Sequence, residues 1–361
     1  MRRFTRNFFL GKVGIGSEHP ISVQSMCNTK TADTASTLKQ ICTLAEHGCD
    51  IIRVSADSPE DCQALGGICR RSPIPVIADI QFSGESALGA IRSGVAGIRV
   101  NPGIISDPDL IGSIAAAAKA AGTVIRVGAN AGSLKPHEVN SRIQMGMEKD
   151  DALADALCGA VLKQCAELEK HGVTNIKAAL KSSNIQVTLQ AYRKFAAITD
   201  YPLHLGLTEA GTPRTGEIKS AVCIGTLLNA GIGDTVRVSL TADPVQEVDA
   251  ALKILEACGM RHNQVEIISC PTCGRTEIDL IGLAEKVENM VKQIQRAGQN
   301  ICWRKIAVMG CPVNGPGEAR DADIGIAGSR NGQLIIFRKG EVIGAYSETE
   351  GFERFSRMIS E

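Results

Sequence analysis

Eight short β-branched runs alternate, over the first two thirds of the chain, with longer stretches of helical periodicity. We expect strands at residues 21–26, 51–55, 74–80, 97–102, 124–130, 175–181, 203–208 and 235–240. The segments between them, such as 31–48 and 243–259, carry apolar residues at helical spacing. Eight strand–helix units in about 250 residues are the size of a (β/α)8 TIM barrel. A doubly wound open sheet is the alternative fold, but no GxGxxG motif follows the first strand.

The pattern of the sequence changes near residues 259–264. Beyond that point we expect a helix at 278–295, a strand at 305–311, a hairpin at 333–346 that turns at Lys339-Gly340, and a closing helix at 351–360. We therefore predict two domains, a TIM barrel over residues 1–262 and a smaller α+β domain over residues 263–361.

Composition excludes several classes of protein. The 361 residues carry a formal net charge of zero, which argues against a nucleic-acid or anionic-membrane partner. No apolar stretch of about 18 residues occurs, so we predict no membrane-spanning helix. The opening MRRFTRNFFLGKVGIG lacks the apolar run of an export signal, and we expect a mature N-terminus. Thirteen scattered cysteines then indicate reduced thiols and a cytoplasmic protein.

An arginine lies inside four of the strand-like runs. The triplets are Ile52-Arg53-Val54, Ile98-Arg99-Val100, Ile125-Arg126-Val127 and Val236-Arg237-Val238. Strand residues alternate between two faces, so an arginine faces the barrel interior when its aliphatic neighbours face the helices. An unpaired guanidinium is costly in a core, but at the carboxyl-end mouth of a barrel it binds anions. We predict that the four arginines converge on one mouth and bind a ligand with more than one phosphate.

Other polar residues lie near the ends of the same strands. Lys181 adds a cation, Asn101, Asn130, His204 and Ser239 add neutral hydrogen-bonding groups, and Asp79 and Glu209 add counter-charges or proton-transfer groups. The competing interpretation is an internal salt-bridge network in which Asp50, Asp79 and Asp234 pair with the arginines. Because the triplet recurs at four strand ends, a shared anion site is the better interpretation.

Cys270 and Cys273 form a CPTC motif, which is half of a metal site. A zinc ribbon requires a second CxxC about 15–20 residues later, whereas the next cysteines are Cys302 and Cys311. The nine remaining cysteines, including Cys42, Cys158 and Cys258, lie on helix-like segments, and we expect them to be small core residues.

The motif GCPVNGPGE carries the third candidate ligand, Cys311, and a carboxylate, Glu318. Its glycines on either side of Pro316 favour a compact turn that returns Glu318 to the neighbourhood of Cys311. Three thiolates and one carboxylate are unusual for structural zinc, but they suit an iron–sulfur cluster in which one iron is exchangeable. Cys302 is the alternative to Glu318 as fourth ligand.

Taken together, these motifs resemble the family of bacterial 4-hydroxy-3-methylbut-2-en-1-yl diphosphate synthases of the non-mevalonate isoprenoid pathway. The resemblance covers most of the chain and is most specific at RVNPG (99–103), VGANAGSL (127–134), PLHLGLTEAG (202–211), GIGDTVRVSL (231–240), CPTC (270–273) and GCPVNGPGE (310–318). Two motifs depart from the family pattern. Asp79-Ile80-Gln81 replaces D-I-H, and Lys181-Ser182-Ser183-Asn184 replaces K-A-S-D.

The resemblance implies a [4Fe–4S] cluster held by Cys270, Cys273, Cys311 and Glu318, with Glu318 giving way to substrate. It implies 2-C-methyl-D-erythritol 2,4-cyclodiphosphate as substrate, opened and dehydroxylated by two electrons from flavodoxin or ferredoxin. The family's phosphate-binding positions fall on Arg53, Arg99, Arg126, Asn130 and Lys181, and its active-site glutamate falls on Glu209.

Two other functions compete with this one. A pterin-type barrel transferase with a structural zinc ribbon would need no redox chemistry. An iron–sulfur scaffold or electron carrier would have no use for a diphosphate pocket, so the arginines disfavour it.

Linker length bears on assembly. The segment GMRHNQ (259–264) spans at most about 20 Å, whereas a barrel measures about 30 Å from rim to rim. The last barrel helix returns the chain to the rim opposite the mouth. We therefore expect the cluster domain to cover the mouth of a partner in a two-fold homodimer with composite active sites, as the resemblance also implies.

Overall fold

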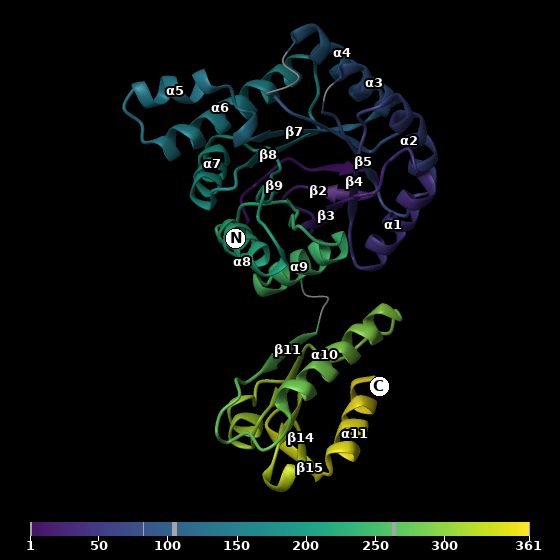
Figure 1. Cartoon of the computed structure of the whole chain (residues 1–361), viewed down its shortest axis with the longest axis vertical. Helices are drawn as coiled ribbons and strands as arrows, with labels where there is room; N and C mark the ends of the chain where they lie inside the picture. The colour runs from purple at the N-terminus through teal and green to yellow at the C-terminus, as the bar shows by residue number, and fades with distance from the viewer. Residues whose placement is uncertain (1, 82, 103–106, 262–264, 361) are drawn as a thin grey trace. The chain divides into compact units, whose positions relative to one another are not determined.

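The structure, a computed structural model, describes residues 2–81, 83–102, 107–261 and 265–360. The chain forms two compact units, Met1–Arg261 and His262–Glu361 (Figure 1). The domain boundary predicted between residues 262 and 263 lies outside the described residues.

Unit 1 contains the eight strands that the sequence predicts. They are β3 (Ser22–Met26), β4 (Ile51–Ser55), β5 (Val76–Asp79), β6 (Gly97–Val100), β7 (Val124–Asn130), β8 (Ile176–Lys181), β9 (His204–Leu205) and β10 (Thr235–Val236). Neighbouring strands are parallel, in the order β8-β7-β6-β5-β4-β3-β10-β9. A parallel bridge between Ala178 and Leu203 joins the two ends of this sheet. The TIM barrel is therefore confirmed, and the open sheet is wrong.

Helices surround these strands (Figure 1). They are α1 (Thr34–Glu46), α2 (Pro59–Arg71), α3 (Gly84–Arg92), α4 (Pro108–Ala121), α6 (Lys149–Lys170), α7 (Ile185–Ile198), α8 (Pro213–Asn229) and α9 (Pro244–Ala257). Local sequence explains their starts: Ser58 accepts a hydrogen bond from the backbone N–H of Asp61 and Pro59 occupies the first turn of α2. A short helix, α5 (Pro136–Gln144), was not predicted and extends the connection between β7 and α6.

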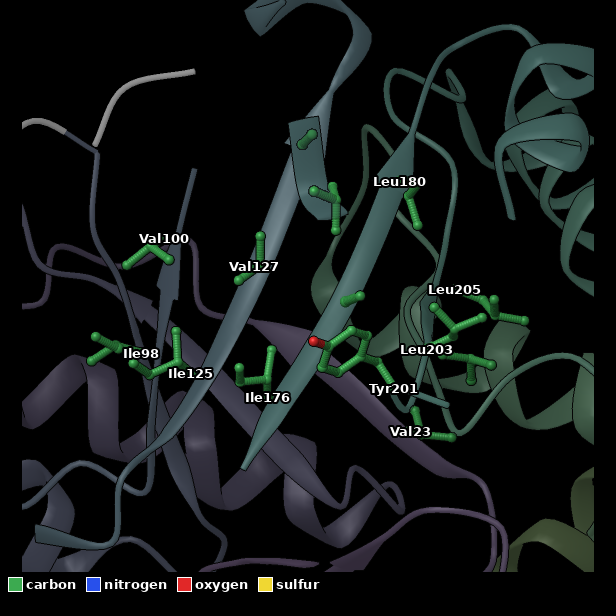
Figure 2. Close-up of a cluster of buried hydrophobic side chains, with 14 of the residues drawn as sticks. Val23, Ile98, Val100, Ile125, Val127, Ile176, Leu180, Tyr201, Leu203 and Leu205 are labelled. Atoms are coloured by element: carbon green, nitrogen blue, oxygen red, sulfur yellow. The ribbon is translucent and has the colours of Figure 1, made fainter. Parts of the chain in front are cut away.

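The outward faces of the strands form the main core with the helices. Figure 2 shows Ile98 and Val100 of β6 beside Ile125 and Val127 of β7, in the register of the two strands. Each of these side chains is almost fully buried, and burying an aliphatic side chain stabilises the fold by about 1.5–3 kcal/mol. This packing directs the residues between them, including Arg99 and Arg126, into the barrel.

An amino-terminal hairpin that the sequence did not predict supplies an apolar base to the barrel. Its strands are β1 (Phe8–Leu10) and β2 (Val13–Ile15). Phe8, Leu10 and Ile15 pack with inward residues from early positions in β4, β5 and β7, namely Ile51, Ile77 and Val124. The barrel interior is therefore apolar toward its amino end and polar toward the mouth.

Unit 2 is a five-stranded sheet in the order β11-β12-β13-β14-β15. The strands are β11 (Glu266–Ser269), β12 (Lys305–Met309), β13 (Ile324–Gly328), β14 (Leu334–Arg338) and β15 (Glu341–Tyr346). The first three are parallel and the last three antiparallel. The predicted hairpin turns at Lys339 and Gly340, whose φ angles are 48° and 81°. Strands β11 and β13 were not predicted.

Two helices, α10 (Leu280–Arg296) and α11 (Glu348–Ser360), share one apolar core with β12, β13 and β14. A short π-helix, η2 (Val313–Glu318), contacts the same strands, and a second apolar cluster contains Ala319, Ala327 and Phe337. None of the helices described in either unit is long and apolar enough to cross a membrane.

The expectation that the nine other cysteines lie in the core is wrong for Cys42, which is exposed on α1. Its neighbour Ile41 is fully buried. Successive helix residues point about 100° apart, so the side chain after a core residue faces away. Cys158 is buried and Cys258 is partly buried.

Candidate active site

Three of the four triplet arginines lie on neighbouring parts of the barrel interior. Arg53, Arg99 and Arg126 are 8%, 4% and 3% exposed. In the parallel register Asp79 aligns with Arg99, and Arg99 aligns with Arg126. The carboxylate of Asp79 forms ion pairs with both Arg53 (Nε–Oδ2, 3.6 Å) and Arg99 (Nη1–Oδ1, 3.3 Å). Register therefore aligns Asp79, Arg99 and Arg126, and the ion pair with Asp79 adds Arg53, which aligns with Ile77.

Lys181 and Arg237 extend this cationic surface. Lys181 ends β8 in register with Asn130, the last residue of β7. Arg237 directly follows β10 and pairs with Glu247 of α9 (Nη2–Oε2, 3.4 Å). A Cβ atom at Gly206 would lie 2.5 Å from the Lys181 Nζ and 2.6 Å from the Arg237 carbonyl oxygen. Glycine at 206 therefore makes the space that the lysine occupies.

Cations outnumber the carboxylates that pair with them in this interior. Asp79 and Glu247 form the ion pairs with Arg53, Arg99 and Arg237. Within the described residues, the Nε and Nη1 atoms of Arg126 are buried without a hydrogen-bond partner. Burial and the neighbouring Arg53 and Arg99 hold the pKa of Arg126 well below its usual value. A bound anion would satisfy donors of this kind.

Burial likewise lowers the pKa of Lys181, with Arg126 and Arg237 adding to the effect. For Asp79, burial opposes ionisation, but Arg53, Arg99 and Arg126 outweigh it and hold the pKa below its usual value. Asp79 is therefore a carboxylate that orders the arginines rather than a proton donor.

The competing salt-bridge interpretation fails for two of its three carboxylates. Asp50 pairs with Arg261 (3.1 Å), and Asp234 pairs with Arg2 (2.8 Å) and accepts a hydrogen bond from Thr5. Of these three carboxylates, only Asp79 forms ion pairs with triplet arginines among the described residues. The Nε and Nη1 atoms of Arg126 have no hydrogen-bond partner there, which a structural salt-bridge network does not explain.

Of the neutral candidates, Asn101, Asn130 and Ser239 lie at or after the ends of β6, β7 and β10, whereas His204 is the first residue of β9. Asn101 is buried after β6 and accepts a hydrogen bond from Ser133 (3.3 Å), a residue that also donates to the Asn130 carbonyl oxygen. His204 is fully buried, its Nδ1 lies 2.8 Å from the Thr235 Oγ1, and burial followed by Lys181 and Arg126 lowers its pKa. Ser239 is partly buried after β10. His204 is thus an uncharged member of the interior.

Glu209 and Gln81 differ from the other candidates. Glu209 is exposed after β9 with a φ of 55°, in the left-handed region. Arg237 forms its ion pair with Glu247, a residue that the sequence analysis did not name. No ion pair between Arg237 and Glu209 occurs among the described residues. Gln81 stands where the family motif has histidine, and its Nε2 donates to Asp79 at 3.5 Å. Its amide therefore reaches the same carboxylate as the arginines.

Lys177 is the most prominent interior residue that the sequence analysis missed. It is fully buried on β8 and aligns with Arg126. The signal was available, because Lys177 and Lys181 are four residues apart in one strand and thus share a face. The analysis named Lys181 alone because it lies at the strand end.

In unit 2, two candidate ligands lie at the carboxyl ends of neighbouring parallel strands. Cys270 directly follows β11, and Cys311 follows β12 by two residues. The backbone N–H of Gly310 donates to the Cys270 Sγ at 3.2 Å, which joins the two strand ends. A Cβ atom at Gly310 would lie 2.7 Å from the Thr276 Oγ1. Glycine at 310 thus lets the CPTC loop approach β12.

Cys273 and Glu318 are both exposed. The backbone N–H of Arg275 and the side chain of Thr276 lower the pKa of the Cys273 thiol, which favours the thiolate that metals bind. Glu318 is the last residue of η2, and π-helical turns are frequent at functional sites. In the described part of the chain no three His, Cys, Asp or Glu side chains are arranged to hold a metal ion.

Cys302 and Cys311 lie on opposite sides of β12 along the chain. Cys302 precedes β12, whereas Cys311 follows that strand. A five-residue strand is about 16 Å long at 3.3 Å per residue. Cys302 therefore lies toward the edge of the sheet opposite to Cys311.

Family models match both units. Residues 5–252 match the GcpE TIM-barrel domain, and residues 266–361 match the GcpE protein C-terminal domain. This chain belongs to the GcpE family. The family and the fold predicted from the motifs are thereby confirmed.

Curated relatives of this GcpE-family chain are 4-hydroxy-3-methylbut-2-en-1-yl diphosphate synthases (flavodoxin). That of Maridesulfovibrio salexigens is 48% identical over 95% of this chain and 92% of its own. That of Frankia casuarinae is 47% identical over 97% of this chain and 88% of its own. The prediction that the chain is an enzyme of this oxidoreductase class is confirmed.

Among solved structures, the Yersinia pestis dihydropteroate synthase (DHPS) with a pterine-sulfa conjugate is similar to this GcpE-family chain. It is 12% identical, with a TM-score of 0.50, over 70% of this chain and 100% of its own. At that identity the likeness shows the barrel fold alone, so it does not support the pterin-type transferase.

Proposed function

We propose that the chain is a flavodoxin-dependent 4-hydroxy-3-methylbut-2-en-1-yl diphosphate synthase that acts on 2-C-methyl-D-erythritol 2,4-cyclodiphosphate. In this reaction two electrons and one proton open the ring, and the C3 hydroxyl leaves as water. One observation carries the proposal: the barrel of a GcpE-family chain buries more cations than its paired carboxylates compensate. A cyclic diphosphate supplies the missing negative charge.

Arg53, Arg99, Arg126 and Lys181 bind the two phosphates. Guanidinium groups donate paired hydrogen bonds to phosphate oxygens, and each such charge-assisted bond is worth about 1.5–3 kcal/mol. Asn101, Asn130, Arg237 and Ser239 lie at or after the ends of β6, β7 and β10, and together with His204 of β9 they donate to or accept from the remaining oxygens. Because the low-dielectric interior strengthens these bonds, the site orients the sugar without help from solvent.

Two carboxylates have different tasks. Asp79 stays ionised between Arg53 and Arg99, so it holds both guanidinium groups in position for the phosphates. Glu209 is exposed after β9 and forms no ion pair with the barrel arginines among the described residues. A carboxylate in that position suits proton transfer at the reacting carbons.

Cys270, Cys273, Cys311 and Glu318 are the residues that would hold a [4Fe–4S] cluster. Two of the four support this assignment, because Cys270 and Cys311 follow the neighbouring strands β11 and β12 and the backbone N–H of Gly310 donates to the Cys270 sulfur. Backbone N–H bonds to sulfur are a usual feature of such sites. When bound, the cluster supplies the electrons and a Lewis-acidic iron. Glu318 would be the hardest and weakest donor of the four, so it would leave the iron that it holds the most exchangeable.

The remaining proposals concern partners and location. Flavodoxin delivers the electrons, as the names of the relatives indicate for those enzymes. The chain acts as a homodimer in which the barrel of one chain and unit 2 of the other form each active site. The short linker near residues 259–264 supports this arrangement. Thirteen free thiols favour the cytoplasm, where they stay reduced.

An anaerobic turnover assay tests the function. Protein reconstituted with iron and sulfide is given the cyclic diphosphate and a low-potential reductant, and the linear diphosphate is measured. We expect product together with about four irons per chain. A colourless protein that holds zinc and forms no product would contradict the proposal and favour a barrel transferase.

A further inference from the structure

Lys177 lies deeper in the barrel than any residue assigned to phosphate binding on its own strand. It is four residues before Lys181, about 13 Å along the strand, and it is 0% exposed. Its neighbours Ile176 and Ala178 pack in the outer core, which turns the lysine inward. In the register of β7 and β8 it lies beside Arg126.

No hydrogen-bond acceptor for the Lys177 Nζ occurs among the described residues. The His204 Nε2, the Nε and Nη1 of Arg126, and the Nε2 and Oε1 of Gln24 are also buried without a hydrogen-bond partner among the described residues. A lysine needed only for its hydrocarbon stem would leave its amine at a polar partner or in water. The amine of Lys177 is instead fully buried and has no hydrogen-bond partner among the described residues.

Several titratable or charged groups surround this amine. Arg53 on β4, Arg126 on β7 and His204 on β9 are basic, and Asp234 before β10 is acidic. The Asp234 carboxylate is already bound to Arg2, to Thr5 and to the backbone N–H of Leu203. Burial, Arg126 and Arg53 lower the pKa of Lys177 to about 7, and Asp234 only partly opposes them. The protonation state of the Lys177 amine therefore responds to a change in the charge of the surrounding groups.

We infer that Lys177 is a positioning residue whose amine takes a proton from solvent when a diphosphate occupies the barrel mouth. The protonated Lys177 amine then repels the Arg126 guanidinium toward the bound diphosphate. One N–H bond forms, and the proton comes from water or buffer. The inference rests on the proposed function only in taking the ligand to be a diphosphate.

Inorganic diphosphate is the probe, because it needs no turnover. Its binding to the reconstituted full-length protein is measured by calorimetry between pH 6 and pH 9, for the wild type and for Lys177→Met. At pH 6 we expect the variant to bind about tenfold more weakly, and by pH 9 we expect the difference to fall to about twofold or less. The ratio of the two affinities cancels the ionisation of the probe itself.

Two buffers of different ionisation heat give a second readout at pH 8. The wild type should take up a proton on binding diphosphate, and Lys177→Met should lose most of that uptake. Lys163→Met, which removes an exposed lysine from α6, is the matched control and should behave as the wild type. Cooperative thermal unfolding checks that each variant is folded, and Lys177→Gln serves if the methionine does not fold.

An affinity ratio that stays constant across the pH range, or proton uptake that survives in both Lys177 variants, would overturn the inference. That result combined with full turnover of the cyclic diphosphate would leave the proposed function standing. Absence of turnover combined with the expected pH-dependent ratio would support the Lys177 inference and count against the proposed function.

Discussion

The barrel interior and the carboxyl edge of the unit 2 sheet organise their candidate residues in opposite ways. Arg53, Arg99 and Arg126 are buried, and strand register fixes their positions. Cys273 and Glu318 are exposed, and they lie on a loop and at the end of a short π-helix. Because cations repel one another, the fold itself must hold these side chains close together before the anion binds. Metal ligands can become ordered when the metal binds, because the binding free energy offsets the cost of bringing them together. Their site therefore need not be formed in advance.

Cysteines show the same contrast. In the barrel, burial raises the pKa of Cys49 and of Cys223 to about 12, so both stay protonated and behave as small apolar residues. In unit 2, backbone N–H groups lower the pKa of the exposed Cys273. The thiols of the two units therefore differ in reactivity because of their surroundings and not because of their number.

The largest expected effect is on the stability of the barrel. Asp79→Asn removes the carboxylate that compensates Arg53 and Arg99, and breaking a buried pair costs about 3–5 kcal/mol. Denaturant unfolding of unit 1 measures the loss. Asp109→Asn, at an exposed position on α4, is the control and should change the free energy of unfolding by about 0.5 kcal/mol or less.

Acid should affect the stability of the wild type and of Asp79→Asn differently. The folded-state pKa of Asp79 is held below its unfolded value, so its stabilisation is present above about pH 3.9 and is lost as the pH falls through the folded-state value. Asp79→Asn lacks that contribution at every pH. Equal acid sensitivity in both proteins would show that Asp79 does not compensate the arginines.

The next effect concerns unit 2. Cys270→Ser should lose most of the iron and the absorbance near 400 nm, and turnover should fall by about 100-fold or more. Glu318→Ala should keep much of the iron and still lose nearly all turnover, because three thiolates remain to hold the cluster. Iron analysis and anaerobic assays measure both.

Cys42→Ser is the matched control, since Cys42 is an exposed thiol of the barrel unit. It should leave iron content and turnover unchanged. Full activity in Glu318→Ala would remove Glu318 from the ligand set.

A smaller effect is expected from Arg126→Ala. The substitution should weaken binding of the cyclic diphosphate by about 1.5–3 kcal/mol, the range of a charge-assisted bond. Stability should change little or rise, because the substitution removes a buried guanidinium that has no ion pair among those described. Calorimetric binding and thermal unfolding distinguish this outcome from a structural role, in which stability would fall and affinity would stay the same.

The smallest expected signal comes from mixing two defective variants at a substrate concentration too low for Arg126→Ala to bind. Arg126→Ala is defective in the barrel and Cys270→Ser in unit 2, so a mixed homodimer with shared sites has one intact site. After reassociation about half the dimers are mixed, and roughly a quarter of wild-type activity should return. If the two units of one chain formed each site, mixing would restore nothing.

Much of the fold was predictable because the signals are local. The eight strands follow from β-branched runs, and the turn at Lys339 and Gly340 follows from its position between two such runs. The missed elements lack those signals. Strand β1 has three residues with an exposed Phe9 between two buried ones, and its burial depends on contacts with distant residues such as Ile77.

The features of the candidate site likewise divide into those that the sequence predicted and those that it did not. The motifs alone predicted the family and its enzyme class, both confirmed by the relatives, and period-two alternation predicted that Arg53, Arg99 and Arg126 point inward. Only the tertiary structure decided that Glu247 pairs with Arg237, that Cys302 and Cys311 lie at opposite ends of β12, and that no acceptor for Lys177 occurs in the part of the chain that the structure describes. The physical reason is that alternation depends on neighbours in the sequence. Charge compensation depends on which groups from distant segments share one low-dielectric space, and that is a property of the folded chain.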